Sequence, residues 1–369
     1  MRFRHLTLTF LVFTCIHTMA ETARPLQPQG QIWLDASPPV PALDIPADVD
    51  AWNKKRTEIR ATLTSMLGDL PPRPSPLEVK TLSREDQGDY WLEKFSFDNG
   101  AGAIVSGYCF LPKSATASNK APTILYCHWH GGQYDVGKQE MLQTNATPVA
   151  AGPEFAKQGY VVLGIDAYGF GERNGQGPDG PANKGSAGEM TASKFQLWMG
   201  RSLWGMIVRD DQIALDYLCS RPEVDASRIG VTGISMGSTR AWWLMALDDR
   251  PKAAVCVACM TRYQDLIQHG MLLAHGIYYF VPGMLKHFDT EAVIACGAPR
   301  PMLFMTGDQD GGSPVEGVRK LGDIVGRVYA LHGKEARSHF DNAIYPGVGH
   351  VYLPEMWQKT VDWMNRWLK

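Results

Sequence analysis

Apolar and polar residues follow two different patterns in the first third of the chain. Over Asp50–Leu67 the apolar residues recur at helical spacing, whereas Tyr90–Phe97 and Ala103–Leu111 alternate with a period of two. The two alternating runs are separated by Asn99-Gly100, a typical turn sequence. The sequence therefore predicts a helix followed by two antiparallel strands.

From about Ala121 onward, short apolar runs alternate with helical patterns. The expected strands are Thr123–Cys127, Val161–Ile165, Ile229–Thr232, Ala253–Ala258 and Met302–Met305, with a weaker last strand at Asn342–Tyr345. The expected helices are Ala151–Gln158, Leu203–Leu218, Ser238–Leu247, Val315–Val328 and Glu355–Trp367. This alternation predicts an α/β fold, with a mostly parallel central sheet and helices on both faces. Reactive groups in such folds gather on loops at the carboxyl ends of strands.

The first twenty residues have the pattern of a signal peptide. Basic residues precede the largely apolar run Leu6–Ile16, and Thr18-Met19-Ala20 offers a small-residue cleavage site. The apolar run is too short to span a bilayer. The alternative is an uncleaved membrane anchor. We predict a secreted or periplasmic protein with no integral span after cleavage.

The rest of the chain is expected to form a leader and one domain. Residues 21–48, rich in Pro, Ala and Asp, predict an extended leader, and residues 49–369 a single catalytic domain. The segment that follows the sixth core strand is longer than a simple crossover, which predicts a short insertion at about residues 260–295.

Composition narrows the class of protein. The 369 residues are 44% hydrophobic, with a formal net charge of −2, and no Lys/Arg-rich run with interleaved aromatic residues occurs, so nucleic acid is not an expected partner. Cys256 and Cys259 have the spacing of a metal pair but lie in an apolar run without a second pair. We interpret them as small buried residues.

The sequence Gly233-Ile234-Ser235-Met236-Gly237 lies between an expected strand and an expected helix. The G-x-S-x-G string alone is weak evidence, but a strand–turn–helix context is where α/β-hydrolases hold a nucleophilic serine. There the N–H of Met236, at a helix N-terminus, would face developing negative charge. The alternative, a serine that only caps a helix, is less consistent with this context. Ser235 is therefore the candidate nucleophile.

A serine needs a base, and in α/β-hydrolases the acid and then the histidine follow it in the chain. His350 lies on a glycine-rich loop between the last expected strand and the last helix, which makes it the candidate base. The loop after Met302–Met305 contains Asp308 and Asp310. We favour Asp310 as the acid because it lies deeper in this loop, and Asp308 is the alternative.

The loop after the first core strand reads His128-Trp129-His130-Gly131-Gly132 and resembles the His-Gly-x-Gly-Gly strings of esterases. In those strings a backbone N–H completes the oxyanion hole. We predict His130 as this second donor beside Met236, with Gly131 as the alternative; Trp129 stands where glycine is more usual. The spacing of His128 and His130 also permits a metal interpretation, but no partners for such a site are evident, and we predict neither a metal nor another cofactor.

Longer segments carry a family resemblance. The stretches 164–173, 228–237 and 298–301 resemble bacterial α/β-hydrolases related to acetyl xylan esterases and dienelactone hydrolases. The resemblance runs from about Trp52 to the C-terminus and implies Ser-His-Asp ester hydrolysis, often on acyl groups attached to carbohydrate. Ser238 departs from the pattern, because many relatives have a second glycine there.

Two groups of residues surround the expected site. The charged residues Asp166, Glu172, Arg173, Arg209 and Asp210 predict a buried network that shapes it. The aromatic-rich insertion could form a wall or small lid, and we select Trp129, Arg262, Tyr263 and His275 as candidate substrate-binding residues. The alternative is that the aromatic residues of the insertion belong to the core.

These features favour an exported carboxylic ester hydrolase that removes small acyl groups from a small-molecule or polysaccharide ester through an acyl-enzyme. A serine peptidase of the same fold is an alternative, although such peptidases usually carry a large extra domain. A non-catalytic binding protein on a hydrolase scaffold is a second alternative. Such a protein is expected to have lost one of the triad residues, whereas this sequence has a candidate at all three triad positions. No oligomeric state is predicted.

Overall fold

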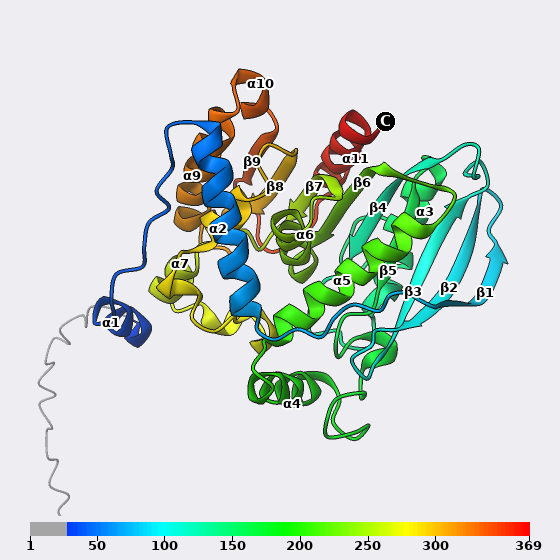
Figure 1. Cartoon of the computed structure of the whole chain (residues 1–369), viewed down its shortest axis with the longest axis horizontal. Coiled ribbons are helices and arrows are strands. Elements are labelled where there is room, and N and C mark those ends of the chain that lie inside the picture. The colour runs from blue at the N-terminus through cyan, green and yellow to red at the C-terminus, as the bar shows by residue number, and fades with distance from the viewer. Residues whose placement is uncertain (1–27) are drawn as a thin grey trace, which may run out of the picture.

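The computed structural model describes residues 28–369, and the predicted signal peptide lies outside them. Its centre is one nine-stranded sheet in the order β1-β2-β3-β5-β4-β6-β7-β8-β9 (Figure 1). The strands are β1 (Val79–Asp86), β2 (Tyr90–Asp98), β3 (Ile104–Pro112), β4 (Ala121–Cys127), β5 (Val161–Ile165), β6 (Val224–Ile234), β7 (Pro251–Val257), β8 (Met302–Gly307) and β9 (Phe340–Tyr345). β1, β2, β3 and β5 pair antiparallel, and every pairing from β5 through β4 to β9 is parallel. The predicted mostly parallel α/β architecture is confirmed.

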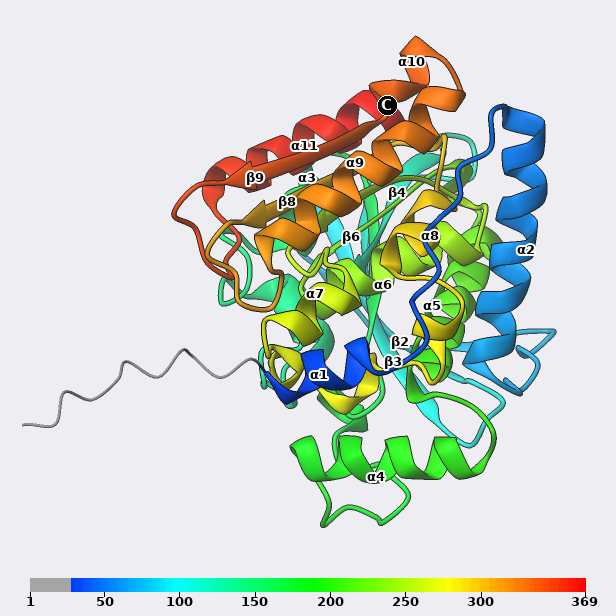
Figure 2. The same cartoon turned by 90° about the vertical axis from the view of Figure 1, so that its left-hand side faces the viewer.

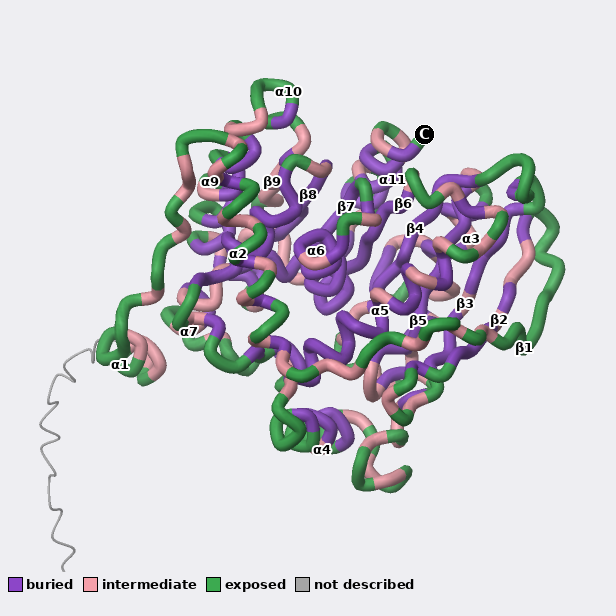
Figure 3. The backbone as a smooth tube through the Cα atoms, viewed as in Figure 1, coloured by how far each residue is buried: buried purple, intermediate pink, exposed green. Residues whose placement is uncertain are grey.

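Helices cover both faces of the sheet because its central strands are apolar on both sides. One face packs against α3 (Ala151–Lys157) and α11 (Pro354–Leu368). The other packs against α5 (Leu203–Ser220), α6 (Met236–Leu247) and α9 (Val315–Leu331). Outside α6 lie α2 (Val49–Leu67) and α8 (Thr290–Ala295), so α6 is buried around its whole circumference (Figure 3).

The smaller elements are short helices and 3-10 turns, most of which gather at one end of the sheet. They are α1 (Gln29–Asp35), α4 (Gly185–Trp198), α7 (Tyr263–Gln268), α10 (Lys334–Arg337) and the 3-10 turns η1 (Gly137–Leu142), η2 (Gly171–Arg173), η3 (Leu272–Ala274), η4 (Ile277–Tyr279) and η5 (Met284–Lys286). Except for α10, they lie at or near the carboxyl ends of the parallel strands, where α4 projects from the body of the protein (Figure 2). No helix within residues 28–369 is long and apolar enough to cross a membrane.

All of the strands and long helices predicted by periodicity are present, with ends shifted by a few residues. The differences are at the periphery. β1 was not predicted because nearly all its residues are exposed, so no apolar alternation marks it. α4 was not predicted either, since exposed apolar residues interrupt its pattern. The leader contains the short helix α1 rather than being extended throughout, and the predicted insertion after β7 contains α7 and η3 to η5.

A fully buried ion pair joins α5 to α6. The Arg240 guanidinium donates to both carboxylate oxygens of Asp211, at 2.9 Å through Nε and 2.5 Å through Nη2. Both side chains are at most 1% exposed. Because a buried charge without its partner is costly, this pair fixes how α6, and with it the loop before it, lies against α5.

Replacing Asp211 tests this constraint. Asp211→Asn leaves the Arg240 charge buried and unpaired, and should lower the free energy of unfolding by about 3–5 kcal/mol in urea denaturation. Asp44→Asn breaks an ion pair with Lys55 in which Asp44 is 86% exposed, and should have far less effect. Equal effects of the two variants would contradict a special role for the buried pair.

Candidate active site

Ser235 lies on a tight turn between β6 and α6. Its φ of 59° and ψ of −120° are strained for a residue other than glycine, and its N–H donates to the Val257 carbonyl at 2.8 Å. A side chain at either Gly233 or Gly237 would overlap the Cys127 carbonyl at the end of β4. The two glycines are therefore required because the turn packs directly on the backbone of the neighbouring strand.

The end of β7 is also strained beside this turn. Ala258 and Cys259 have φ angles of 60° and 53°. Ser238 donates to the Ala258 carbonyl at 2.6 Å, and the Cys259 N–H donates to the Ser313 hydroxyl at 3.0 Å. Ser238, where many relatives have glycine, thus holds β7 against the start of α6.

The candidate acid and base meet above the sheet. Asp310, on the loop after β8, accepts a hydrogen bond from His350 Nδ1 at 2.8 Å, and its other oxygen accepts from the Gly312 N–H at 2.9 Å. Asp310 is 3% exposed, while the His350 side chain is 33% exposed. A proton on Nδ1 leaves Nε2 of His350 as the acceptor that a general base requires.

Asp308 has a different contact. Its carboxylate accepts from the Gly347 N–H at 2.7 Å, which ties the loop after β8 to the loop that carries His350. The structure thus brings Asp310, and not Asp308, into contact with His350.

The serine hydroxyl faces a neighbouring thiol in this structure. Within residues 28–369, its polar contact is Cys259 Sγ at 3.7 Å, and it makes no hydrogen bond with His350. Catalytic hydrogen bonds are often long in structures without substrate, and a rotation about the Ser235 Cα–Cβ bond can redirect the hydroxyl.

The predicted oxyanion loop follows β4. Met236 is the first residue of α6, so its N–H has no acceptor within the helix. The N–H of Trp129 is already bonded to Glu140 at 2.7 Å, whereas no acceptor for the N–H of His130 or Gly131 occurs in the described part of the chain. The N–H of Trp129 is therefore occupied, and His130 and Gly131 both remain candidates for the second donor.

Glu140, which the sequence did not single out, is fully buried beneath this loop. Burial raises the pKa of its carboxyl to about 7, although hydrogen bonds from Tyr126 at 2.6 Å and from the Trp129 N–H oppose the rise. The carboxylate therefore connects the predicted oxyanion loop to Tyr126 near the carboxyl end of β4.

The two histidines of this loop have separate structural partners. His128 is buried, bonds the Trp129 carbonyl through Nδ1 at 2.7 Å and accepts from the Ala167 N–H through Nε2 at 3.0 Å. Burial holds its pKa well below the usual range, so the ring is neutral. Both of its nitrogens are occupied, and the described residues contain no cluster of three metal-ligating side chains.

His130 is held by α4 and η4. Nδ1 accepts from the Gly132 N–H at 3.0 Å, so Nε2 carries the proton and donates to Glu189 of α4 at 2.9 Å. Tyr134 also donates to Glu189, at 3.1 Å, and the Tyr278 ring of η4 stacks on the imidazole with centroids 5.0 Å apart. Glu189, Tyr134 and Tyr278 thereby position the predicted oxyanion loop.

The candidate substrate residues of the insertion occupy different places. Arg262 pairs with Glu291 at 3.1 Å and with Asp265 at 3.3 Å, so its charge is neutralised inside the insertion. Tyr263 lines a cavity on the outer side of the insertion. His275 is 8% exposed and bonds the Gly312 carbonyl at 2.9 Å, which places it behind the loop that carries Asp310.

The predicted charged network is present as two groups of ion pairs, which Arg173 joins by donating to the Asp166 backbone carbonyl at 3.1 Å. Lys138 Nζ donates to Asp166 at 2.7 Å and to Glu172 at 2.6 Å, beneath the loop after β5. Arg173 pairs with Asp210 at 2.9 Å, and the same carboxylate accepts from Arg209 and Asn99. The sequence missed Lys138, which lies in the short turn η1 after β4 and has no pattern that marks it as buried.

The comparisons with known proteins identify the family of this chain. The model of the Abhydrolase family matches residues 39–334. "Putative hydrolase YtaP" of Bacillus subtilis (strain 168) is 37% identical over 300 residues, which are 78% of this chain and 95% of that protein.

The chain belongs to the Abhydrolase family.

Solved structures share the fold of this Abhydrolase family member. A "putative acetyl xylan esterase" from Bacteroides fragilis has a TM-score of 0.68 at 20% identity, covering 91% of this chain and 89% of that one. A "Glucuronoyl Esterase" from Solibacter usitatus has a TM-score of 0.66 at 18% identity, covering 88% and 98%. The resemblance to α/β-hydrolases drawn from the sequence is confirmed.

The pKa of Glu140 predicts a pH dependence in this Abhydrolase domain. Because its pKa in the folded protein lies above the unfolded value of about 4.5, its contribution to stability is full below that pH and is lost as pH rises through about 7. The free energy of unfolding of the wild type relative to Glu140→Gln should fall by about 3 kcal/mol between pH 4.5 and pH 8.

Glu172 supplies a control of opposite sign. Burial raises the pKa of the Glu172 carboxyl, but contact with Lys138 and Lys94 outweighs burial and holds this pKa at about 2. The stability that Glu172 contributes relative to Glu172→Gln is present above about pH 4.5 and should be lost as pH falls toward 2. If the difference in free energy of unfolding between the wild type and Glu140→Gln stays constant from pH 4.5 to pH 8, the raised pKa of Glu140 is contradicted.

Proposed function

We propose that the protein is a carboxylic ester hydrolase that uses Ser235 as nucleophile, His350 as general base and Asp310 as the acid that orients the imidazole. The observation that carries the proposal is the 2.8 Å hydrogen bond from His350 Nδ1 to Asp310, formed beside a strained serine turn. Membership of the Abhydrolase family and the order serine, acid, histidine along the chain support it.

The reaction would proceed through an acyl-enzyme. His350 Nε2 takes the Ser235 proton as the oxygen attacks the carbonyl carbon, and the N–H groups of Met236 and His130 stabilise the resulting oxyanion. The imidazolium then protonates the departing alkoxide, which leaves as the alcohol. Water, deprotonated by His350, attacks the acyl–serine ester; the acid is released as the imidazolium returns the proton to the Ser235 oxygen.

We propose a small acyl group attached to carbohydrate as the substrate class. Both structurally similar esterases are named for esters of carbohydrates, and the acetyl ester of xylan is the one with a small acyl group. Ser235 is only 9% exposed, and Cys259 Sγ lies 3.7 Å from its hydroxyl oxygen, which favours a compact acyl group. Export to the periplasm or the medium, proposed from residues 1–20, would bring the enzyme to such external substrates.

Substitution of Ser235 tests the nucleophile. The wild type should hydrolyse 4-nitrophenyl acetate faster than 4-nitrophenyl octanoate, and Ser235→Ala should lower kcat/KM by at least about 10³-fold. Ser227→Ala, an exposed serine of β6, should retain activity. Retention of the rate by Ser235→Ala would refute the assignment, and preferential cleavage of a peptide 4-nitroanilide would favour a peptidase instead.

The two aspartates of the loop after β8 allow a paired test of the acid. Asp310→Asn preserves shape but removes the charge that orients His350, and kcat should fall by about 10⁴-fold. Asp308→Asn weakens a contact to the Gly347 backbone and should lower kcat far less than Asp310→Asn does. If both variants are folded by circular dichroism and Asp308→Asn loses more kcat than Asp310→Asn, Asp308 and not Asp310 is the acid.

A further inference from the structure

Large apolar side chains are exposed together on the projecting helix α4 and on the insertion. We call six of them the apolar face: Met190, Leu197, Trp198, Leu272, Leu273 and Phe280. Their exposed fractions begin at 40% for Phe280 and reach 92% for Trp198 and 97% for Leu273. Exposed apolar side chains are unremarkable when scattered singly, but a contiguous group of them marks an interaction site.

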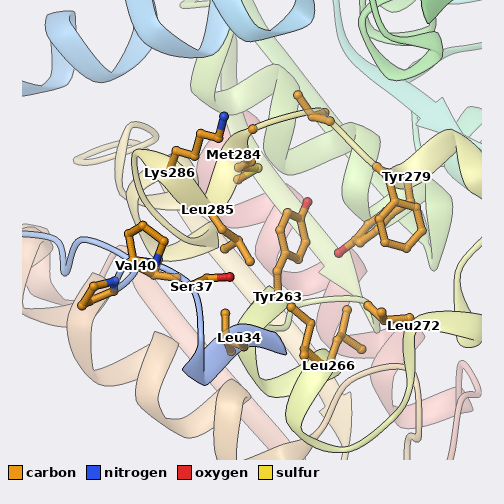
Figure 4. A pocket seen from close by; sticks show the side chains of 16 residues that line it. Leu34, Ser37, Val40, Tyr263, Leu266, Leu272, Tyr279, Met284, Leu285 and Lys286 are labelled. Carbon is orange, nitrogen blue, oxygen red and sulfur yellow. The ribbon is translucent and has the colours of Figure 1, made fainter. Parts of the chain in front are cut away.

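The members from α4 adjoin those from the insertion. Met190, Leu197 and Trp198 follow helical spacing, which places them on one side of α4 and its buried residues on the other. Leu197 and Phe280 line a common cavity of about 320 Å³. Phe280 and Leu272 in turn line the outer cavity, a space of about 620 Å³ between the leader and the insertion (Figure 4). The apolar face therefore extends from α4 across the insertion to the leader.

The charges around this face have one sign. Within residues 184–199 and 270–287, the exposed Lys, Arg, Asp and Glu side chains are Lys184, Lys194 and Lys286. Glu189, the one acidic residue of these two segments, is buried and bonded to His130. Lys194 lies on α4 within the apolar face, and Lys286 lines the outer cavity. Exposed apolar side chains are thus combined with positive charge.

This combination distinguishes between three kinds of partner. In a two-fold dimer the face of a second copy would meet the same face, which would bring the lysines of both copies together. A polysaccharide needs hydrogen-bond partners for its hydroxyl groups, and among the six side chains only the Trp198 indole donates. An anionic lipid surface accepts apolar side chains and tryptophan at its headgroup boundary and attracts lysine.

We propose that the apolar face docks the protein on an anionic lipid surface. Trp198 and Leu273 enter the boundary between the headgroups and the acyl chains, and Lys194 and Lys286 contact the lipid phosphates. The binding is peripheral and does not depend on the proposed triad. Because Glu189, on the same helix, bonds His130, docking would hold the candidate active site close to the lipid surface.

Co-sedimentation of the full chain with phosphatidylglycerol vesicles tests the apolar contribution. Trp198→Ala combined with Leu273→Ala should lower partitioning onto the vesicles roughly tenfold or more, because both side chains lose their burial in lipid. The matched control Leu82→Ala removes a leucine of β1 that is 53% exposed, and should leave partitioning unchanged. Equal partitioning of the wild type and the double variant would overturn the proposal.

A local readout separates docking by this face from binding through the apolar run of residues 6–16. A nitrobenzoxadiazole label on Leu273→Cys should fluoresce more strongly when phosphatidylglycerol vesicles are added, because its surroundings become apolar. The same label on Leu82→Cys should not respond. Binding of the protein without a response from the label at position 273 would refute docking by the apolar face.

Two further measurements identify the partner. Lys194→Gln combined with Lys286→Gln should weaken binding to phosphatidylglycerol vesicles several-fold and leave binding to phosphatidylcholine vesicles unchanged, since only the former are anionic. Equal losses on both lipids would contradict the role of charge. If light scattering shows a wild-type dimer that Trp198→Ala with Leu273→Ala converts to a monomer, the face is an interface between copies, and the lipid proposal is wrong.

Discussion

The close approach of the Ser235 turn to the end of β4 is the constraint on which the candidate site depends. Gly233 and Gly237 both lie against the Cys127 carbonyl, so the turn cannot move away from β4 without losing the packing of α6 on the sheet. This approach places the first N–H groups of α6 next to the loop that begins at His128. The serine and both candidate oxyanion donors are thus positioned by one backbone contact between adjacent parallel strands.

Three carboxylates hold the loops that this contact brings together; Glu140 and Glu189 are buried, and Asp308 is partly exposed. Glu140 bonds the Trp129 N–H, Glu189 bonds the His130 ring, and Asp308 bonds the Gly347 N–H. Each carboxylate comes from a different segment and accepts from a loop at the carboxyl ends of the strands. Loops of this kind otherwise have few apolar contacts, so charge-assisted hydrogen bonds are an effective means of fixing their positions.

The insertion and the leader add a second layer around this centre. His275 supports the loop of Asp310 through the Gly312 carbonyl, and the Tyr279 ring stacks on His275 with centroids 4.2 Å apart. Tyr279 also lines the outer cavity, so one aromatic side chain separates the acid loop from that cavity. The insertion is therefore both a support for the acid loop and a wall of the outer cavity, which explains its aromatic content.

The sequence determined strands β2 to β9, the long helices and the candidates Ser235 and His350, because period, turn composition and strand–helix alternation are local properties of the chain. Tertiary structure decided which aspartate meets His350, and that Arg262 is neutralised by Glu291 and Asp265. It also brought in Glu140, Glu189 and Lys138, whose partners lie between 11 and 59 residues away along the chain. A polar residue that is buried by such distant contacts has no local pattern that distinguishes it from a solvated one, so only the folded chain reveals its role.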